Sequence, residues 1–124
     1  MLARIELEGL EELINAVQRL GSEGRKIENK ALKEAGAVMK EAIQNETPVR
    51  TGKLKNSITV SGIKTKDGVK YADVGPNKDG WYAKFAEFGT VKMRANPFMA
   101  RGFESAKDQA TATIKEELRR GLGL

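Results

Sequence analysis

The chain has 124 residues, about the length of one domain, with 22 Lys and Arg against 17 Asp and Glu, a formal charge of +5. It contains no Cys and no His. This excludes disulfides and removes the commonest nucleophiles, general bases and transition-metal ligands, so we expect neither an enzyme nor a cofactor. No apolar run reaches the ~20 residues of a membrane span and the N-terminus is unlike a signal peptide, so we expect a soluble intracellular protein without membrane contact.

The first 46 residues are predicted to form a short strand and then a helical arm. Apolar and charged residues alternate within 1–8, as in a half-buried strand. The arm covers 9–46, and its first apolar residues lie at helical spacing: Leu10, Leu13, Ile14, Val17 and Leu20. Gly21 suits the end of this first amphipathic helix, and Ser22 is placed to cap a second one.

The second helix is predicted over about 22–46. Its apolar stripe consists of small and medium side chains: Ile27, Ala31, Ala35, Val38, Met39, Ala42 and Ile43. We expect this stripe to pack against the protein's own sheet rather than to form a groove for a partner. Pro48 disfavours helical geometry in Thr47 and lacks an amide donor, so the helix must end there.

Residues 47–96 are predicted to form a strand-and-loop core that begins with a single helical turn, capped by Thr51. Two alternating runs follow, 58–65 and 69–74, and the Asp67-Gly68 pair between them is a strong hairpin signal. The side chains expected to face the core include Val60 or Ile63 and Tyr71.

The remainder of this core is predicted to be an exposed loop at 75–80 and a short helix or bent segment at 81–88 that ends at Gly89. The next segment, 90–95, has no clear period and is predicted to be a loop or an edge strand. We expect this segment to be flexible in the free protein and to become ordered on assembly.

Asn96 and Pro97 are a good helix-start signal, with Asn96 as cap and Pro97 in the first turn, so the C-terminal part, 97–124, is predicted to be a helix over about 97–120. Its apolar residues are Phe98, Phe103, Ala106, Ala110, Ile114, Leu118 and Leu122. The sequence therefore predicts one α+β domain, 1–124. A small antiparallel sheet with a central β-hairpin packs against two long helices, and a shorter N-terminal helix accompanies them.

The basic excess is concentrated in 47–101, where eleven Lys and Arg face four Asp and Glu, a net charge of +7. Residues that could contact DNA or a partner are Lys64, Lys66, Lys70, Lys92 and Arg94, with Arg50, Lys53 and Lys55 nearby in sequence and Tyr71, Trp81 and Tyr82 as stacking groups. A solvated lysine-rich face explains the same count and is the simpler interpretation. No nucleic-acid fold signature or phosphate-binding loop accompanies these residues.

Four blocks follow the long helix in a fixed order: TPVRTGKLKNSI at 47–58, VGP at 74–76, YAKFAEFGT at 82–90 and NPFM at 96–99. Together they resemble the HK97 gp10-like family of tailed-bacteriophage proteins, over about 9–120. The residues that carry the likeness are Pro48, Arg50, Thr51, Gly52, Leu54, Ser57, Gly75, Pro76, Tyr82, Phe85, Glu87, Phe88, Gly89, Thr90, Pro97 and Phe98.

The resemblance implies a structural protein of the phage head–tail junction, described as a neck, tail-completion or minor tail component. Such a protein is expected in the virion, and in the bacterial host cytoplasm during assembly, as a homo-oligomeric ring around the DNA channel. Its partners would be other head-completion and tail proteins, with non-specific contact to passing DNA, and the family has no known enzymatic activity or cofactor. The alternatives are a small basic nucleic-acid-binding protein of a mobile element, or a toxin or regulator of one.

A mechanism follows from the resemblance. The blocks at 47–57 and 82–90 would lie together, locked by a small core of Leu54, Tyr82, Phe85 and Phe88. The basic loops around 64–70 and 90–94 would then be free to reach a neighbouring subunit, the head-closure ring or the DNA channel.

Overall fold

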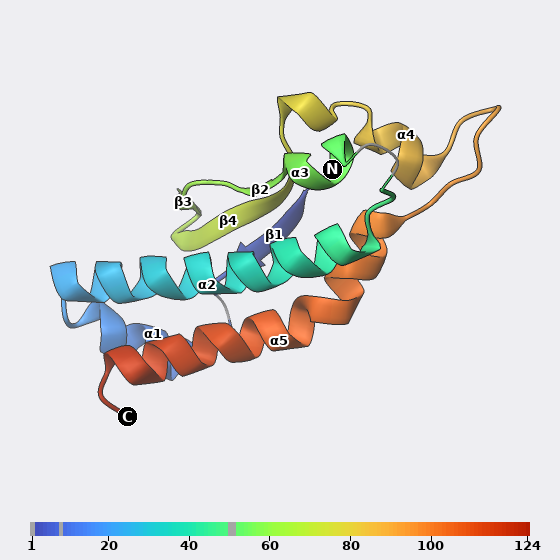
Figure 1. Cartoon of the computed structure of the whole chain (residues 1–124). Coiled ribbons are helices and arrows are strands. Elements are labelled where there is room, and N and C mark those ends of the chain that lie inside the picture. Colours follow the sequence, from blue (N-terminus) through green and yellow to red (C-terminus); the bar gives the residue numbers. More distant parts are fainter. Residues whose placement is uncertain (1, 8, 50–51) are drawn as a thin grey trace.

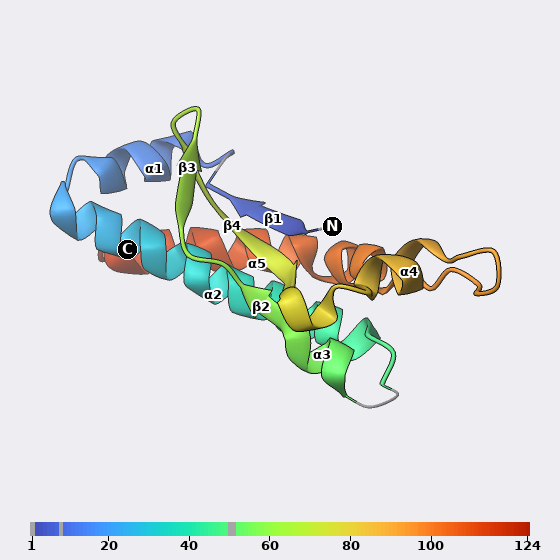
Figure 2. The same cartoon turned by 90° about the horizontal axis from the view of Figure 1, so that it is seen from above.

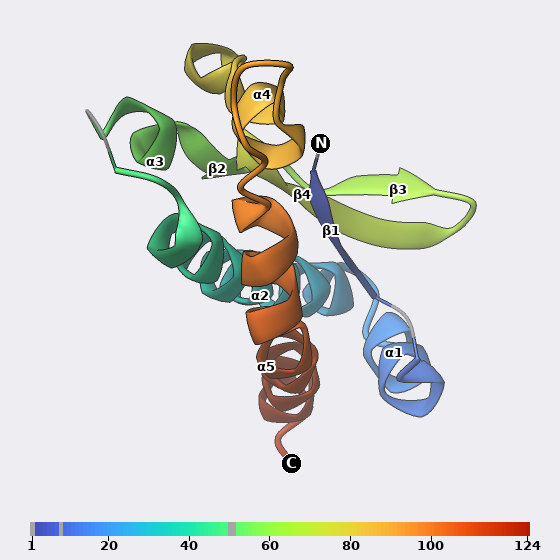
Figure 3. The same ribbon diagram turned by 90° about the vertical axis from the view of Figure 1, so that its right-hand side faces the viewer.

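The computed structural model describes residues 2–7, 9–49 and 52–124. It confirms an α+β fold with a small antiparallel sheet and two long helices, α2 (Ser22–Glu46) and α5 (Phe98–Gly121). Figure 1 shows α2 and α5 side by side along one face of the sheet. Figure 3 shows both long helices below the strands, and α4 above one end of the opposite face, which is otherwise open.

The pairing of α2 with α5 forms most of the core. The helices run antiparallel, because Ile43 near the end of α2 lies against Gly102 at the start of α5, whereas Ile27 lies against Gly121. Buried side chains along the two helices include Ala31, Leu32, Ala35, Met39, Ile43, Ala106, Ala110, Ile114 and Leu118. The predicted stripe is thus buried inside the protein, and its small residues allow the two backbones to approach closely.

The sheet is built around its longest strand, β4 (Val69–Pro76). β1 (Ala3–Glu6) pairs with one edge of β4, and β2 (Ile58–Val60) and β3 (Lys64–Lys66) pair with the other. The predicted hairpin is confirmed between β3 and β4, where Asp67 and Gly68 both have positive φ, 52° and 79°, as a tight two-residue turn requires.

The first arm of the hairpin is not one continuous strand as predicted. Val60 pairs with Val74 but Lys64 pairs with Tyr71, so residues 61–63 contain one more residue than the opposing stretch of β4. Ser61 stabilises this bulge, since its Oγ accepts the amide of Asp73 at 2.9 Å. After the extra residue, the side chains of the first arm lie on the opposite faces from those that simple alternation with Val60 would give. Lys64 therefore lies on the open face of the sheet, beside Tyr71.

The prediction that Tyr71 faces the core is wrong. Ala72 and Val74 are the fully buried residues of β4 on the helix side, and Tyr71 takes the opposite face, where it pairs with Glu6. The guanidinium of Arg4 lies 3.9 Å from the centre of the Tyr71 ring, and its Nε donates to Asp73 Oδ1 at 2.9 Å. This hydrogen bond raises the pKa of Arg4. Val60 and Ile63 are partly buried against the core, as expected.

Short helices complete the fold: α1 (Glu11–Gln18), α3 (Lys53–Ser57), the 3₁₀ turn η1 (Lys78–Gly80) and α4 (Ala83–Phe88). α1 matches the predicted first helix and buries Val17. Ser22 is the first residue of α2 and not its cap, since the N-cap position is taken by Gly21, which has a φ of 61°. No side chain donates or accepts a capping hydrogen bond there. Figure 2 shows α3 and α4 together at one end of the molecule, with α1 at the other.

The close contact of the two long helices gives a first prediction. A Cβ on Gly102 would lie 2.6 Å from the Cα of Ile43, so Gly102→Val must push α5 away from α2. We expect a loss of about 1–3 kcal/mol in the free energy of unfolding, measured by urea denaturation. Ala100→Val is the matched control, because Ala100 is exposed on the same helix. Equal effects of the two substitutions would contradict the packing argument.

Candidate interaction surface

The structure places the two main motif blocks against each other, where they line an open groove of about 570 Å³. Residues from α3 and the segment before it form one wall, and residues from α4 form the other. The lining consists of Pro48, Gly52, Leu54, Tyr82, Phe85, Ala86 and Met93. None of these described lining residues is charged, so the groove suits an apolar side chain.

The same end of the molecule exposes an unusual number of large apolar side chains. Of the nine large apolar residues exposed in the described chain, six gather there: Val49, Trp81, Phe85, Phe88, Val91 and Met93. The Trp81 ring meets the rings of Tyr82 and Phe85 edge to face, with centroids 5.9 and 6.0 Å apart. We call these six residues, with the groove beside them, the apolar end.

The predicted small core of Leu54, Tyr82, Phe85 and Phe88 is therefore wrong in part. Leu54 is buried and Tyr82 is half-buried, but Phe85 is 39% exposed and Phe88 is 72% exposed. The residues that α4 buries are instead Ala83 and Glu87, one helical turn apart. Because this face is turned inward, the aromatic face of the same helix is turned toward solvent.

Glu87 is buried because it caps the start of α5. Its Oε2 accepts the amide of Met99 at 2.9 Å, and its Oε1 accepts the amide of Ala100 at 3.1 Å. These amides belong to the first turn of α5, which has no intrahelical partners for them and carries the positive end of the helix dipole. A carboxylate from one helix thus fixes the direction of another.

This cap replaces the predicted one. The N-cap of α5 is Pro97, with no cap from its own side chain, and Phe98, the first residue of the helix, is fully buried. The amide oxygen of Asn96 accepts from Arg101 at 2.5 Å, and Arg101 also bonds to Glu46 at the end of α2. The sequence pattern offered Asn96 as the nearest capping residue, and nothing local marked Glu87.

Residues 89–96 form a projecting loop, which we call the finger; Figures 1 and 2 show it extending beyond α4. Its tip is a tight turn, in which Thr90 and Met93 exchange backbone hydrogen bonds of 2.8 and 3.3 Å. Its base is tied to α4 because the amide of Asn96 donates to the carbonyl of Ala86 at 2.7 Å. All eight residues are described and none is in a strand, so the finger is a loop, one of the two forms predicted.

Gly89 is required at the base of the finger. Its φ is 76°, and a Cβ there would lie 2.8 Å from both the amide nitrogen of Ala95 and the carbonyl oxygen of Met93. Thr90 Oγ1 accepts the amide of Lys92 at 3.2 Å and supports the tip.

Other motif residues support the region from inside. Ser57 is buried and its Oγ donates to the carbonyl of Leu54 at 2.6 Å. Gly75 is buried and Pro76 is half-buried at the end of β4. Arg50 and Thr51, including the predicted cap of α3, lie outside the described residues.

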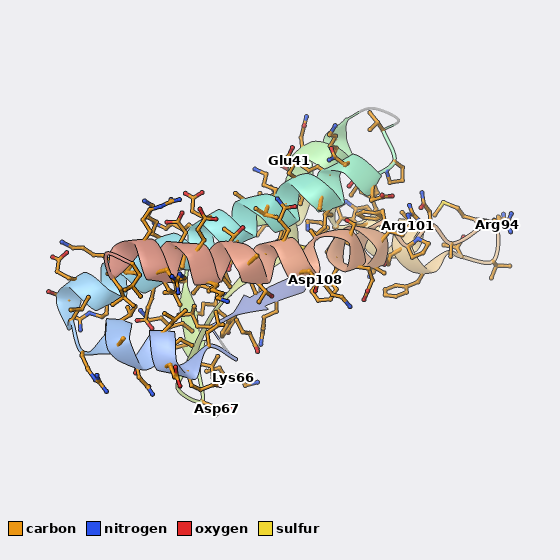
Figure 4. The ribbon with its side chains drawn as sticks, turned by 90° about the horizontal axis from the view of Figure 1, so that it is seen from below. Glu41, Lys66, Asp67, Arg94, Arg101 and Asp108 are labelled. Atoms are coloured by element: carbon orange, nitrogen blue, oxygen red, sulfur yellow. The ribbon has the colours of Figure 1, made fainter. Side chains whose placement is uncertain are left out.

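The predicted basic residues do not form one surface. Lys64 and Lys66 are exposed on β3, whereas Lys92 and Arg94 are exposed on the finger. Figure 4 shows Lys66 at one side of the molecule and Arg94 at its far end. Lys70 turns inward, where its Nζ lies 3.4 Å from a carboxylate oxygen of the buried Glu28 and 3.2 Å from Asn29 Oδ1.

The described residues form neither a metal-binding cluster nor a membrane-spanning helix. They contain no group of three or more acidic residues placed to hold a metal ion. Among their helices, none combines the length and the apolar character that crossing a membrane requires.

The Glu87 cap gives a second prediction. Glu87→Ala leaves the buried amide of Met99 and the partly buried amide of Ala100 without an acceptor, so we expect the free energy of unfolding to fall by about 1–3 kcal/mol. Glu87→Gln keeps one acceptor oxygen and should cost less. Glu104→Ala, an exposed carboxylate on α5, is the control in the same thermal denaturation series. If Glu87→Ala behaves like this control, the cap does not stabilise α5.

A comparison with known protein families identifies the chain. The family model described as "Bacteriophage HK97-gp10, putative tail-component" matches residues 11–89, from α1 to the base of the finger. Comparisons with curated proteins and with solved structures gave no match. The family match covers more than half of the chain and includes both walls of the groove. The chain therefore belongs to the HK97 gp10-like family of bacteriophage tail components, which gives it a structural role in the phage.

Proposed function

We propose that this protein is a neck or tail-completion protein of the phage head–tail junction, which assembles as a ring around the DNA channel. The observation that carries the proposal is the apolar end. A solvent-exposed cluster that includes Trp81, Phe85 and Phe88 is costly for a free protein and is typical of a surface that another protein covers.

The apolar end also indicates the chemistry of what covers it. Lys84, Lys92 and Arg94 are exposed around it, and the carboxylate of Glu87 within it is buried against α5. A partner surface that combines apolar side chains with carboxylates would complement it. Two apolar ends brought face to face would instead place like charges together, so a symmetric contact of this surface with itself is disfavoured.

The family match supports a place in the virion among other phage proteins. A ring at the junction would surround DNA, and the exposed cations of β3 and of the finger are suited to non-specific contact with phosphates. Lys70 has no part in this proposal, because Glu28 already pairs with it.

A DNA-binding protein of a mobile element is the second candidate, and the exposed cations favour it. That function predicts affinity for free DNA that falls steeply with salt and is lost when Lys64, Lys66, Lys92 and Arg94 are neutralised. A junction protein should bind free DNA weakly, and the same neutralised variant should show little change in fluorescence-anisotropy titrations.

The proposed role gives a third prediction. Phe88→Ser removes an exposed aromatic side chain of the apolar end without altering the core. In a phage that lacks its own copy of the gene, we expect this variant to lower the yield of complete particles at least about tenfold, the factor for a loss of ~1.4 kcal/mol in association. Free heads and free tails should accumulate in electron micrographs.

Leu20→Ser is the matched control, because Leu20 is an exposed apolar residue far from the apolar end. It should complement as well as the unaltered chain. Full complementation by Phe88→Ser, and by Trp81→Ser as a second variant, would contradict the role of the apolar end in joining.

A further inference from the structure

The free edge of β1 has backbone groups available for pairing. The amide of Leu7 donates to the carbonyl of Lys70 at 3.0 Å, and the antiparallel register then directs the backbone of Ile5 toward β4. The amides and carbonyls of Arg4 and Glu6 therefore point away from the sheet. β1 ends the sheet on this side, and Figures 2 and 4 show no other strand of the described chain beyond it.

A groove of about 500 Å³ runs along this edge, between β1 and the first turns of α5. We call it the β1 groove; its lining consists of Leu2, Ala3, Arg4, Glu6, Glu87, Met99, Ala100 and Phe103. Most of these side chains are apolar. The guanidinium of Arg4 is neutralised by Asp73, whereas the carboxylate of Glu6 is exposed and makes no ion pair or hydrogen bond with a described residue. The groove is therefore apolar with a local negative charge beside a free strand edge.

The finger has the complementary properties. Val91 at its tip is fully exposed, so its apolar side chain gains nothing within its own subunit. Lys92 and Arg94 are exposed cations without an ion pair to a described residue. Because Thr90 and Met93 close a tight turn, Val91 and Lys92 stand together at its tip, where a neighbouring surface can contact both.

We propose that the finger of one subunit occupies the β1 groove of the next copy of this chain. Val91 at the turn of the finger then lies over Met99 and Phe103, backbone groups of the finger bond to the free amides and carbonyls of β1, and a finger cation pairs with Glu6. The proposal rests on the proposed function, because it supplies the subunit contact of the ring.

Charge distinguishes this groove from the groove of the apolar end. That groove has no acidic residue in its described lining and has Lys84 beside it, so a basic finger would be repelled there. The β1 groove offers Glu6 instead. Since finger and groove are different surfaces, the contact is heterologous, and repetition of one such contact closes a ring when the rotation permits.

Cross-linking tests the contact directly, because the chain contains no Cys of its own. Copies carrying Glu6→Cys are mixed with copies carrying Val91→Cys and treated with a short bismaleimide. We expect a mixed dimer, and a ladder of higher oligomers from the chain that carries both substitutions. The control mixture pairs Val91→Cys with Lys64→Cys, an exposed position on β3. Equal yields of mixed dimer from the two mixtures, or no mixed dimer at all, would overturn the proposal.

A charge exchange provides the second measurement. Glu6→Lys alone, and Lys92→Glu with Arg94→Glu, should each weaken self-association roughly tenfold in sedimentation velocity, and the triple variant should recover most of it. All three side chains are exposed, so circular dichroism should show unchanged folding. Failure of the triple variant to recover would contradict the pairing of the finger with Glu6.

The two proposals fail separately. If Phe88→Ser blocks the joining of heads to tails while the Glu6 and Val91 positions do not cross-link, the role at the junction stands and the finger contact is overturned. If the specific cross-links form but loss of the protein leaves head–tail joining intact, the finger contact stands and the proposed function is overturned.

Discussion

The carboxylate of Glu87 at the start of α5 decides how the apolar end of this protein is arranged. A helix as short as α4 can bury only one narrow face. The two hydrogen bonds that Glu87 accepts from α5 turn the face with Ala83 and Glu87 inward. The larger apolar side chains of the helix then have no place inside. Hydrophobic burial alone would favour the opposite orientation, with Phe85 and Phe88 inward. The need of the α5 amides for an acceptor outweighs it, and the exposed aromatic surface follows from that choice.

Local patterns were sufficient to predict the framework. The Asp67-Gly68 pair determines its own turn, because both residues adopt positive φ angles. The apolar stripes of α2 and α5 identify their buried faces directly, because the helical spacing of apolar residues does not depend on what the helix packs against. Such local patterns do not predict interactions between residues that are distant in the sequence. In the sequence Glu87 is an ordinary polar residue of a short helix, and its role as a cap depends on where α5 begins in space. The prediction for Tyr71 fails because strand alternation separates two faces of β4 but does not show which face the helices cover.

The bulge at 61–63 shows how one inserted residue affects the surface. Without it, Lys64 would continue the alternation of Val60 and point toward α2, where no described acidic residue besides Glu28 is buried. With it, both lysines of β3 lie on the open face, and only Lys70 reaches Glu28. From Glu28 to Glu46, the α2 residue bonded to Arg101, α2 rises about 27 Å, so the basic hairpin and the basic finger are held well apart. Any one partner that contacts both must be extended.

The finger, the aromatic face and the α5 cap form one mechanical unit. The amide of Asn96 at the base of the finger bonds to Ala86, within the same turn as the capping carboxylate, and the chain enters α5 two residues later. Met99 and Ala100, in that first turn of α5, line the β1 groove. The finger and the β1 groove are therefore both anchored to the same short helix, α4, which fixes the angle between them. The proposed ring requires this angle to be the same in every subunit, and a buried carboxylate that accepts hydrogen bonds from two amides is a rigid way to set it.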